Sequence, residues 1–340
     1  MNRFVRLLLI GFVCACLLLC GVGCHQNETP VTKLTNVSLC EVTHSVFYAP
    51  QYVALSLGFF EEEGLDVELS TGEGADKVMA AVLSGNIDIG FAGPEAAIYV
   101  YAEGRDNYSQ VFAQLTRRDG SFLVSRKQEP DFTWASLKGK TVLPGRVGGV
   151  PYMTLCSVLR HTGKLDLATD LTLDSSIQYA LMTSAFVNGT GDYVTAFEPT
   201  ASTLEQNGQG YVVASVGEAA GEIPYTAYFA SKDYIAANSD TVQAFTNAIY
   251  KGQKWVASHS AAEIAKVVSS HFADTDTALL ESSIQRYQEI GAWNETPLLS
   301  EEAYLRLQTV MKEAGELEQT VAYDPVVTTA FAQKAVETVK

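Results

Sequence analysis

Residues 44–69, HSVFYAPQYVALSLGFFEEEGLDVEL, connect two segments in which apolar and polar residues alternate. The first alternating segment, Leu34–Val42, and the second, Leu65–Leu69, are each typical of a β-strand. Between them the apolar spacing predicts a short helix, which Gly58 breaks, and Gly64 then allows a tight turn with positive φ. A strand, a helix and a strand in this order predict one βαβ unit of a parallel sheet.

The turn that follows the first predicted strand is the first candidate ligand site. Ligands of open α/β sheets bind beyond the carboxyl ends of the strands, which is where this turn is expected. It carries an imidazole, two aromatic rings and an amide, on His44, Phe47, Tyr48 and Gln51. Phe47 and Tyr48 fit an ordinary aromatic core equally well, so the turn alone does not decide between binding and packing.

A second turn of this kind, Gly93-Pro94-Glu95, follows the apolar segment 87–92. Pro94 suits the first position of a helix, and Glu95 suits the positive end of the helix dipole. The free amides at this helix start are also candidates for holding a ligand anion. We therefore expect Gly93, Pro94 and Glu95 on the same side of the sheet as the first turn.

A glycine-rich loop, PGRVGGVP at 144–151, precedes a predicted helix over 152–161. Glycines let backbone amides approach whatever lies above the loop. The loop lacks the Gly-Lys-Ser/Thr end of a phosphate-binding P-loop and does not match Gly-x-Gly-x-x-Gly. It is therefore interpreted as a general binding loop, with ligand contacts expected from Arg146, Gly148, Gly149 and Val150.

Two further segments are candidates for connections between lobes. Ser109–Thr116 and Ser121–Ser125 are predicted strands separated by a polar bend that contains Arg117. This pattern fits either a crossing between two lobes or a plain β-hairpin. Ile223–Ala230 is the candidate return crossing, and it contributes Tyr225 as a possible ligand contact.

The dipeptide Glu198-Pro199 stands between a predicted strand, 191–197, and a predicted helix, 200–206. A carboxylate at this junction is expected to point toward the same crevice as the other turns. There Glu198 would accept hydrogen bonds from ring N–H groups of a ligand, and an exposed capping role is the alternative. Tyr193, in the preceding strand, is a further aromatic candidate.

The start of the chain predicts a secretory signal over residues 1–23. It has a short basic start and then an uncharged segment, Leu7–Gly23, which ends in small residues. Gly21-Val22-Gly23-Cys24 resembles a bacterial lipobox, which predicts lipidation of Cys24 and a tether over 24–35. Cys16 is a weaker candidate for the lipidated residue. An uncleaved anchor helix is the alternative, since the apolar segment is at the lower edge of a membrane span.

Charge and composition exclude several classes of protein. The net charge is −16 at pH 7, and it becomes −18 when the two arginines of the signal are removed. An acidic chain without a basic run argues against nucleic acid as a partner. Cys40 and Cys156 remain after processing, without metal-ligand spacing, so buried free thiols are expected and a disulfide between them is left open. No metal site or cofactor is predicted.

Together these segments resemble the solute-binding proteins of ABC importers for sulfonates, nitrate and thiamine pyrimidine precursors. The resemblance runs over residues 37–260. It rests most on Tyr52–Leu69 and Ala81–Gly90, and then on Leu-Lys-Gly-Lys at 137–140 and on Glu-Pro at 198–199. The lipobox agrees with it.

The resemblance implies an α/β fold with two lobes, of the periplasmic-binding-protein type II class. Its sheets would be mostly parallel and flanked by helices, and its C-terminal part would be helical. Lobe 1 would contain residues 36–123 and 226–340, and lobe 2 residues 124–225. A hinge motion at the two crossings would close the lobes around a ligand.

The resemblance also implies the partners. These are a small-molecule ligand and the permease and ATPase subunits of an importer. The lipid anchor would hold the protein at the outer face of a bacterial cell membrane, and the protein is expected to be a monomer. The favoured ligand is a thiamine pyrimidine precursor or a similar flat heteroaromatic molecule. Pyrimidine binders of this family usually carry Asp-Trp where Glu41-Val42 stands, so stacking would fall to Phe47 or Tyr48.

Two alternatives to a heteroaromatic ligand remain. An alkyl sulfonate, taurine or nitrate would be held by hydroxyls, amides and a cation such as Arg117 or Arg146. An enzyme similar to thiamine-pyrimidine synthases is less favoured, because the cysteine-rich iron motif of those enzymes does not occur in this sequence. Since hydrolase motifs do not occur either, we expect a protein that is not an enzyme.

Overall fold

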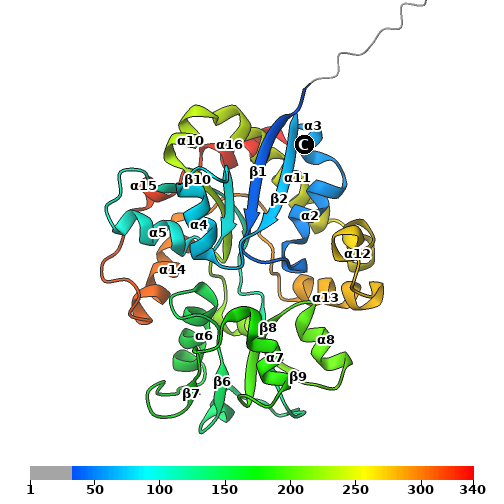
Figure 1. The fold of residues 1–340 in the computed structure, drawn as a ribbon, viewed down its shortest axis with the longest axis vertical. Coiled ribbons are helices and arrows are strands. Elements are labelled where there is room, and N and C mark those ends of the chain that lie inside the picture. The colour runs from blue at the N-terminus through cyan, green and yellow to red at the C-terminus, as the bar shows by residue number, and fades with distance from the viewer. Residues whose placement is uncertain (1–32) are drawn as a thin grey trace, which may run out of the picture. The chain divides into compact units, whose positions relative to one another are not determined.

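The computed structural model describes residues 33–340, so the predicted signal and Cys24 lie outside the described residues. This part of the chain contains two five-stranded sheets flanked by helices (Figure 1). The first sheet has the order β2-β1-β3-β10-β4, with β1 Thr35–Glu41, β2 Leu65–Thr71, β3 Ile89–Ala92, β4 Ser109–Thr116 and β10 Thr226–Ser231. The second has the order β7-β6-β8-β5-β9, with β5 Ser121–Ser125, β6 Thr141–Leu143, β7 Thr172–Leu173, β8 Tyr193–Phe197 and β9 Tyr211–Ser215.

Both sheets are mixed rather than mostly parallel, which corrects the expectation from the sequence. In the first sheet β1 is parallel to β2 and β3, whereas β10 is antiparallel to β3 and β4. In the second sheet β6 is parallel to β7 and β8, whereas β5 is antiparallel to β8 and β9. The antiparallel strands β5 and β10 are the first strands that the chain forms after it passes from one sheet to the other. They therefore do not follow a helical crossover between two strands of the same sheet, which parallel pairing requires.

The chain passes between the sheets twice. Because β4 pairs with β10 and β5 pairs with β8 and β9, the bend at 117–120 is a crossing and not a hairpin turn. The return runs from β9 through α9 (Val216–Ala220) to β10. All of β5 belongs to the second sheet. The division of the chain into two moving lobes stays a prediction.

Helices cover the sheets, and the C-terminal part is helical as expected (Figure 1). The α-helices besides α9 are α2 Ala49–Ser56, α3 Phe59–Glu62, α4 Ala75–Leu83, α5 Glu95–Ala102, α6 Val150–His161, α7 Met182–Val187, α8 Thr200–Gln206, α10 Lys232–Ala237, α11 Ser239–Ala257, α12 Ala261–Val268, α13 Thr277–Glu289, α14 Glu301–Glu313, α15 Tyr323–Val326 and α16 Ala330–Thr338. Short 3₁₀ helices are η1 Val46–Tyr48, η2 Trp134–Leu137, η3 Tyr179–Leu181 and η4 Ser269–Phe272. Within residues 33–340, no helix is both long and apolar enough to span a bilayer.

One predicted helix is wrong. The apolar spacing over 325–339 predicts a single helix, but the chain leaves the helical conformation at Val327 and resumes it in α16. Val327 forms a β-bridge with Val111 of β4. The helix is therefore interrupted by a pairing with the first sheet, which the local pattern does not contain.

The opening βαβ unit is confirmed. β1 and β2 pair in parallel, from Thr35 opposite Leu65 to Glu41 opposite Thr71. Gly58 has a φ of 74° between α2 and α3, and Gly64 has a φ of 81° before β2.

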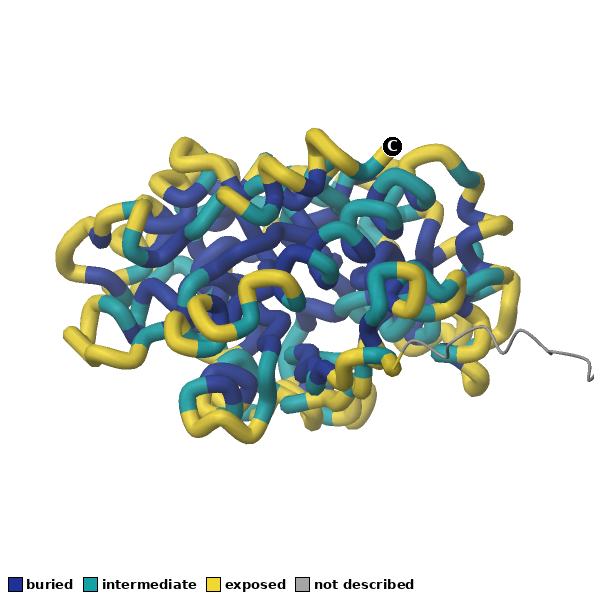
Figure 2. Tube along the Cα trace, turned by 90° about the horizontal axis from the view of Figure 1, so that it is seen from above, coloured by how far each residue is buried: buried dark blue, intermediate teal, exposed yellow. Residues whose placement is uncertain are grey.

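Buried residues lie in the interior of the described chain, and the exposed residues lie around the outside (Figure 2). The larger hydrophobic cluster extends from the first sheet and the C-terminal helices into the second sheet. A smaller one lies within the second sheet, around Leu123, Val142 and Leu159. Cys40 and Cys156 are both buried and free, so the expected free thiols are confirmed.

The packing of α11 on α2 makes a testable prediction. A Cβ atom at Gly252 of α11 would lie 2.2 Å from the carbonyl oxygen of Pro50 in α2. Gly252→Ala should therefore force the two backbones apart and reduce the free energy of unfolding by about 1–3 kcal/mol, measured by urea unfolding. Gly85→Asn is the control, because Gly85 has open surroundings and a φ of 73° that asparagine tolerates. Equal losses in the two variants would contradict the prediction.

Candidate ligand-binding site

Aromatic rings from both sheets meet where the crossings lie. The ring of Phe47, in η1 after β1, is centred 5.5 Å from that of Tyr48 and 5.7 Å from that of Tyr225. It lies 5.9 Å from Phe197, at the end of β8, and 4.9 Å from Tyr287 of α13. We call these five residues the central aromatic cluster. Tyr287 was not predicted, because it lies in a C-terminal helix whose apolar spacing indicates only packing.

The turn after β1 is organised by Glu41, which is fully buried. Gln51 Nε2 and the Tyr52 hydroxyl donate hydrogen bonds to Glu41 Oε2 at 2.9 and 2.7 Å. His44 Nδ1 lies 2.9 Å from Glu41 Oε1, and this hydrogen bond raises the pKa of His44. Gln51 Oε1 accepts a hydrogen bond from Tyr228. The amide of Gln51 is thus bonded within the protein, and the partly exposed ring of His44 is engaged as well, because its Nε2 lies 2.8 Å from the carbonyl oxygen of His271.

Glu95, at the start of α5, is a buried carboxylate. Its side chain folds back over Gly93, so that a Cβ atom on Gly93 would lie 1.9 Å from Glu95 Oε2. The residue is 2% exposed, and among the described residues Oε2 has no hydrogen-bond partner. Burial raises the pKa of Glu95 to about 7, although backbone amides, including that of Val150, and the charge of Arg146 lower it. Glu95 is therefore a buried acceptor that the protein leaves partly unused.

Asp119, in the first crossing, is a second buried carboxylate. Its Oδ1 accepts hydrogen bonds from the amide and hydroxyl of Ser121 at 2.7 and 2.6 Å, and Oδ2 has no partner within residues 33–340. Asp174 makes the same two bonds with Ser176 in a more exposed loop, where they lower its pKa. Burial instead raises the pKa of Asp119 to about 7. Asp119 was not predicted as a site residue, although an Asp-x-Ser turn inside a predicted crossing was a usable signal.

The hydroxyl of Tyr225 completes this group. It is buried and forms no hydrogen bond of normal geometry in the described part of the chain, although it lies close enough to Asp119 to lower the pKa of that carboxyl as a donor. Burial raises the pKa of Tyr225 well above its ordinary value, and the charges of Asp119 and Glu95 raise it further. Both carboxylates therefore contribute to the raised pKa of this one hydroxyl. Three partnerless polar atoms, Glu95 Oε2, Asp119 Oδ2 and Tyr225 OH, accompany the central aromatic cluster.

Two cavities adjoin this region. The smaller, of about 180 Å³, is lined by residues 43–45 after β1 and by Tyr179 and residues 195–200 of the second sheet. The larger, of about 1050 Å³, is lined by α4, α5, residues 146–148 and residues 316–322. The larger cavity thus brings together the candidates Glu95, Arg146 and Gly148. Pro94 and Gly149 precede α5 and α6, and Val150 begins α6.

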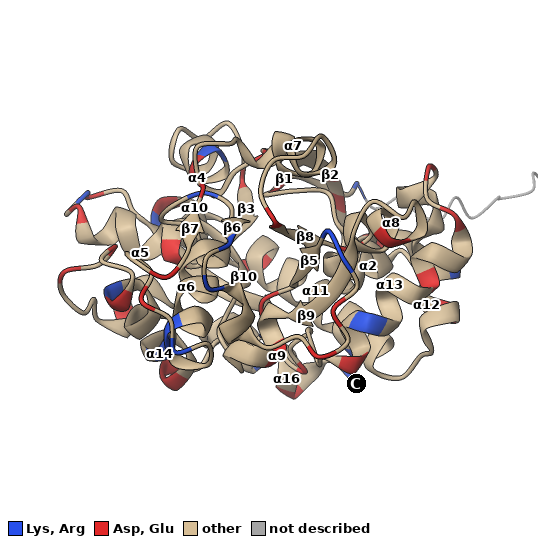
Figure 3. Cartoon of the chain, turned by 90° about the horizontal axis from the view of Figure 1, so that it is seen from below, with Lys and Arg blue, Asp and Glu red and all other residues tan. Residues whose placement is uncertain are grey.

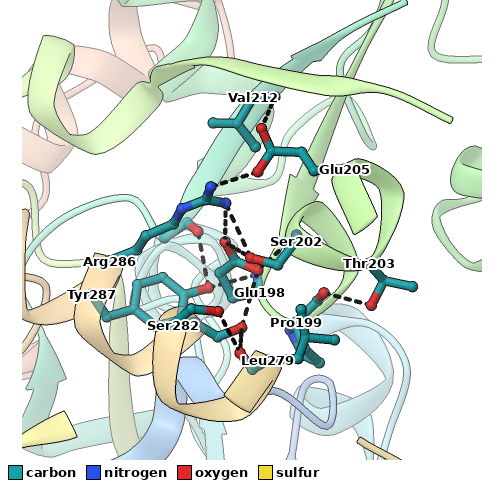
Figure 4. A network of polar contacts seen from close by, with 12 residues as sticks. Glu198, Pro199, Ser202, Thr203, Glu205, Val212, Leu279, Ser282, Arg286 and Tyr287 are labelled. Atoms are coloured by element: carbon teal, nitrogen blue, oxygen red, sulfur yellow. Dashed lines mark hydrogen bonds and ion pairs between the residues drawn. The ribbon is translucent and has the colours of Figure 1, made fainter. Parts of the chain in front are cut away.

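Glu198 has its acceptors taken up within the protein (Figure 4). Arg286 of α13 donates to Oε1 at 2.7 Å, and Ser202 donates to both oxygens from its hydroxyl and amide at 2.9 Å. Ser283 donates to Oε2 at 3.3 Å. Arg286 also pairs with Glu205 of α8. Glu198 therefore joins α8 to α13, and its predicted role as a ligand acceptor stays a prediction.

Arg117 and Tyr193 are engaged elsewhere. Arg117 Nε donates to the carbonyl of Gly291 at 3.1 Å, and its guanidinium forms ion pairs with Glu222 and Glu295. The hydroxyl of Tyr193 donates to Glu129, and its ring packs in the smaller hydrophobic cluster. The structure does not bring these two candidates together with the others. In the described residues, no group of three or more His, Cys, Asp or Glu side chains is arranged to hold a metal ion.

Comparison with known proteins assigns the family. The model of the family described as "NMT1/THI5 like" matches residues 46–262. The chain is also 45% identical, over 337 residues and 98% of each chain, to a Bacillus subtilis (strain 168) protein named "Putative binding protein YtlA". The chain therefore belongs to the NMT1/THI5-like family.

Solved structures confirm the two-sheet fold of periplasmic binding proteins. The alkanesulfonate-binding protein SsuA from Xanthomonas axonopodis pv. citri, bound to MOPS, has a TM-score of 0.71 at 18% identity, covering 88% of this chain and 99% of SsuA. The nitrate-binding protein NrtA from Synechocystis PCC 6803 has a TM-score of 0.71 at 15% identity, covering 91% and 90%. The desulfurization enzyme DSZB has a TM-score of 0.62 at 15% identity, covering 89% and 99%. At these identities the likeness shows the fold alone.

The ion pair between Arg286 and Glu198 generates a prediction. Arg286→Met leaves Glu198 buried without its cation, and should reduce the free energy of unfolding by about 3 kcal/mol, the lower end for a broken buried pair because Arg286 is 30% exposed. Arg105→Met is the control: its pair with Glu103 is exposed on both sides, so a change within about 1 kcal/mol is expected. Urea unfolding checks both, and a loss below 1 kcal/mol in Arg286→Met would refute the structural role of the pair.

Proposed function

We propose that this protein is the extracytoplasmic solute-binding component of an ABC importer, and that it holds a flat heteroaromatic ligand with N–H donors between two lobes. The favoured class is a thiamine pyrimidine precursor. The observation that carries the proposal is the group of three partnerless polar atoms, on Glu95, Asp119 and Tyr225, beside the central aromatic cluster. Membership of the NMT1/THI5-like family supports the solute-binding role.

The aromatic surroundings favour a flat ligand. Tyr179 lines the smaller cavity, is 44% exposed, and lies 6.4 Å from the ring of Phe197. Stacked or edge-to-face contacts with such rings contribute about 0.5–1.5 kcal/mol beyond the burial of area. Phe47 and Tyr48 are at most 2% exposed and packed against other rings. We therefore assign ligand stacking to Tyr179 and Phe197, rather than to Phe47 and Tyr48.

The carboxylates favour a ligand that donates hydrogen bonds. An ionised carboxylate can only accept them, and a buried acceptor without a partner costs about 1–3 kcal/mol. A ligand with N–H groups at Glu95 Oε2 and Asp119 Oδ2 would remove this cost on binding. Glu95 and Asp119 thus take the acceptor role that the sequence gives to Glu198.

The second candidate ligand is an oxyanion, such as an alkyl sulfonate, taurine or nitrate. The observation in its favour is Arg146, whose side chain is 53% exposed and whose nearest carboxylate oxygen, on Asp76, is 4.0 Å away. Arg146 lines the larger cavity together with Glu95. A synthase-like enzyme is a third possibility, and we propose binding without chemistry because the curated relative YtlA is named as a binding protein.

Ligand-dependent thermal unfolding tests the proposal. 4-Amino-5-hydroxymethyl-2-methylpyrimidine, thiamine, riboflavin, ethanesulfonate and nitrate are each added to the purified protein. A ligand at 100 times its Kd stabilises by about 2.7 kcal/mol, so a heteroaromatic probe should raise the midpoint by several degrees. Asp119→Asn should reduce the affinity for that probe at least tenfold, because it replaces an acceptor by a donor.

Asp174→Asn is the matched control for Asp119→Asn. Asp174 makes the same Asp-x-Ser hydrogen bonds in an exposed loop, whereas Asp119 is fully buried, so ligand binding should not change in Asp174→Asn. A shift with ethanesulfonate or nitrate, and none with the three heteroaromatic probes, would contradict the proposed ligand class. Unchanged affinity in Asp119→Asn would remove Asp119 from the site.

We also propose that Cys24 carries the lipid anchor on the outer face of a bacterial cell membrane, with residues 24–35 as a tether. The support is the lipobox-like sequence at 21–24. The partners would be the permease and ATPase subunits of the importer, and the protein would act as a monomer.

Cys24→Ser tests the anchor. In cells labelled with a palmitate analogue, the variant should lose the label and leave the membrane fraction, because the acylated thiol is absent. Cys16→Ser is the control and should remain labelled. Label on Cys24→Ser, or its loss from Cys16→Ser, would assign the anchor to another position.

A further inference from the structure

This inference rests on the proposed function, in which a ligand binds between the lobes. We infer that Glu95 is a built-in anion that sets the charge specificity of the site. Its carboxylate lies against the start of α6, the helix that follows β6 of the second sheet. Its negative charge there excludes oxyanion ligands. Its unpaired oxygen is left to accept a hydrogen bond from an N–H group or a cation of the ligand.

The position of Glu95 is fixed by its own segment. Gly93 has no side chain, so the carboxylate can fold back to where a Cβ atom would otherwise stand, 1.9 Å from Oε2. Glu95 lines the larger cavity together with Arg146 and Gly148, which directly precede α6. One turn further along α5, the hydroxyl of Tyr99 donates to the carbonyl of Gly148 at 3.0 Å. α5 and the loop before α6 are therefore in direct contact.

The start of α6 is suited to an anion. The helix is 12 residues long, and its N-cap residue is Gly149, which has no side chain to bond the first amides. Such a helix start attracts negative charge through its free N–H groups and its dipole. Burial raises the pKa of Glu95 to about 7, and the amide of Val150 and the charge of Arg146 act against this rise by stabilising the carboxylate. The carboxylate of Glu95 therefore already takes the place that a sulfonate or nitrate oxygen would need.

The surrounding charges act in the same direction. The larger cavity is lined by more acidic than basic residues: Asp76, Glu95, Glu103, Glu316 and Glu318 against Arg105 and Arg146. Over the described chain as a whole, acidic residues are spread over many helices and loops (Figure 3). A second anion would be repelled beside Glu95, whereas a cation or an N–H donor would be attracted. Because Oε2 is buried and without a partner, this preference has a defined contact point.

Two probes and three variants test the inference. Binding of ethanesulfonate and of 4-amino-5-hydroxymethyl-2-methylpyrimidine to the full-length protein is measured by calorimetry in sulfonate-free buffer. The unmodified protein should bind the pyrimidine and not ethanesulfonate. Glu95→Ala should lose at least tenfold in affinity for the pyrimidine and gain measurable binding of ethanesulfonate, since the start of α6 is uncovered. Glu95→Gln keeps the size of the side chain and should also lose at least tenfold for the pyrimidine.

Glu68→Gln is the control, because Glu68 of β2 is exposed and lines neither cavity, so the variant removes one negative charge outside the proposed site. It should bind like the unmodified protein. Circular dichroism and thermal unfolding establish that each variant is folded, and Glu95→Gln carries the test if Glu95→Ala does not fold.

The outcomes distinguish a failure of the inference about Glu95 from a failure of the proposed function. If the unmodified protein binds the pyrimidine but Glu95→Gln binds it equally well, the inference is overturned and the proposed function stands. The same holds if folded Glu95→Ala gains no affinity for ethanesulfonate. If the unmodified protein binds ethanesulfonate instead, or neither probe, both the inference and the proposed ligand class fail.

Discussion

A carboxylate buried away from water must find donors, and this requirement shapes the region between the two sheets. Four carboxylates at most 2% exposed lie there: Glu41, Glu95, Asp119 and Glu198. Donors of the protein saturate Glu41 and Glu198, the latter through Arg286. Glu95 and Asp119 each keep one oxygen that no described residue bonds. The first pair is therefore engaged within the fold, and we propose that the second pair bonds a ligand.

Much of the fold could be predicted because it depends on local properties. Alternating residues marked the strands, and the left-handed turns at Gly58 and Gly64 stand where the sequence placed them. The antiparallel orientation of β5 and β10 could not be predicted from local residues, because it depends on the chain passing from one sheet into the other. The break of the last predicted helix at Val327 likewise arises from a pairing with Val111, more than 200 positions earlier.

The candidate site was less predictable, because burial and donors are properties of the assembled fold. The rule that ligands bind at strand ends predicted Glu95 but gave equal weight to Glu198, and Tyr225 was predicted from the candidate return crossing. Arg286, which saturates Glu198, lies 88 positions further along the chain, in a helix that showed only packing residues. Asp119 was missed because a polar bend between strands is ordinarily exposed, whereas this one crosses between two sheets and is buried.

The two sides of the region between the sheets are built differently, and this bears on how a ligand reaches Glu95. On the side of α8 and α13, Arg286 donates a hydrogen bond to the carboxylate of Glu198, and the hydroxyl of Tyr287 accepts one from the amide of Glu198. The ring of Tyr287 also packs on Phe47 within the central aromatic cluster. On the side of α5 and α6, the contact of Tyr99 with Gly148 adjoins the larger cavity. Atoms that line a cavity have few partners across it, so separating this side loses fewer contacts. If the two sheets belong to lobes that move apart, as we propose, opening should cost least beside Glu95, and the carboxylate would then meet a ligand at entry as well as in the closed form.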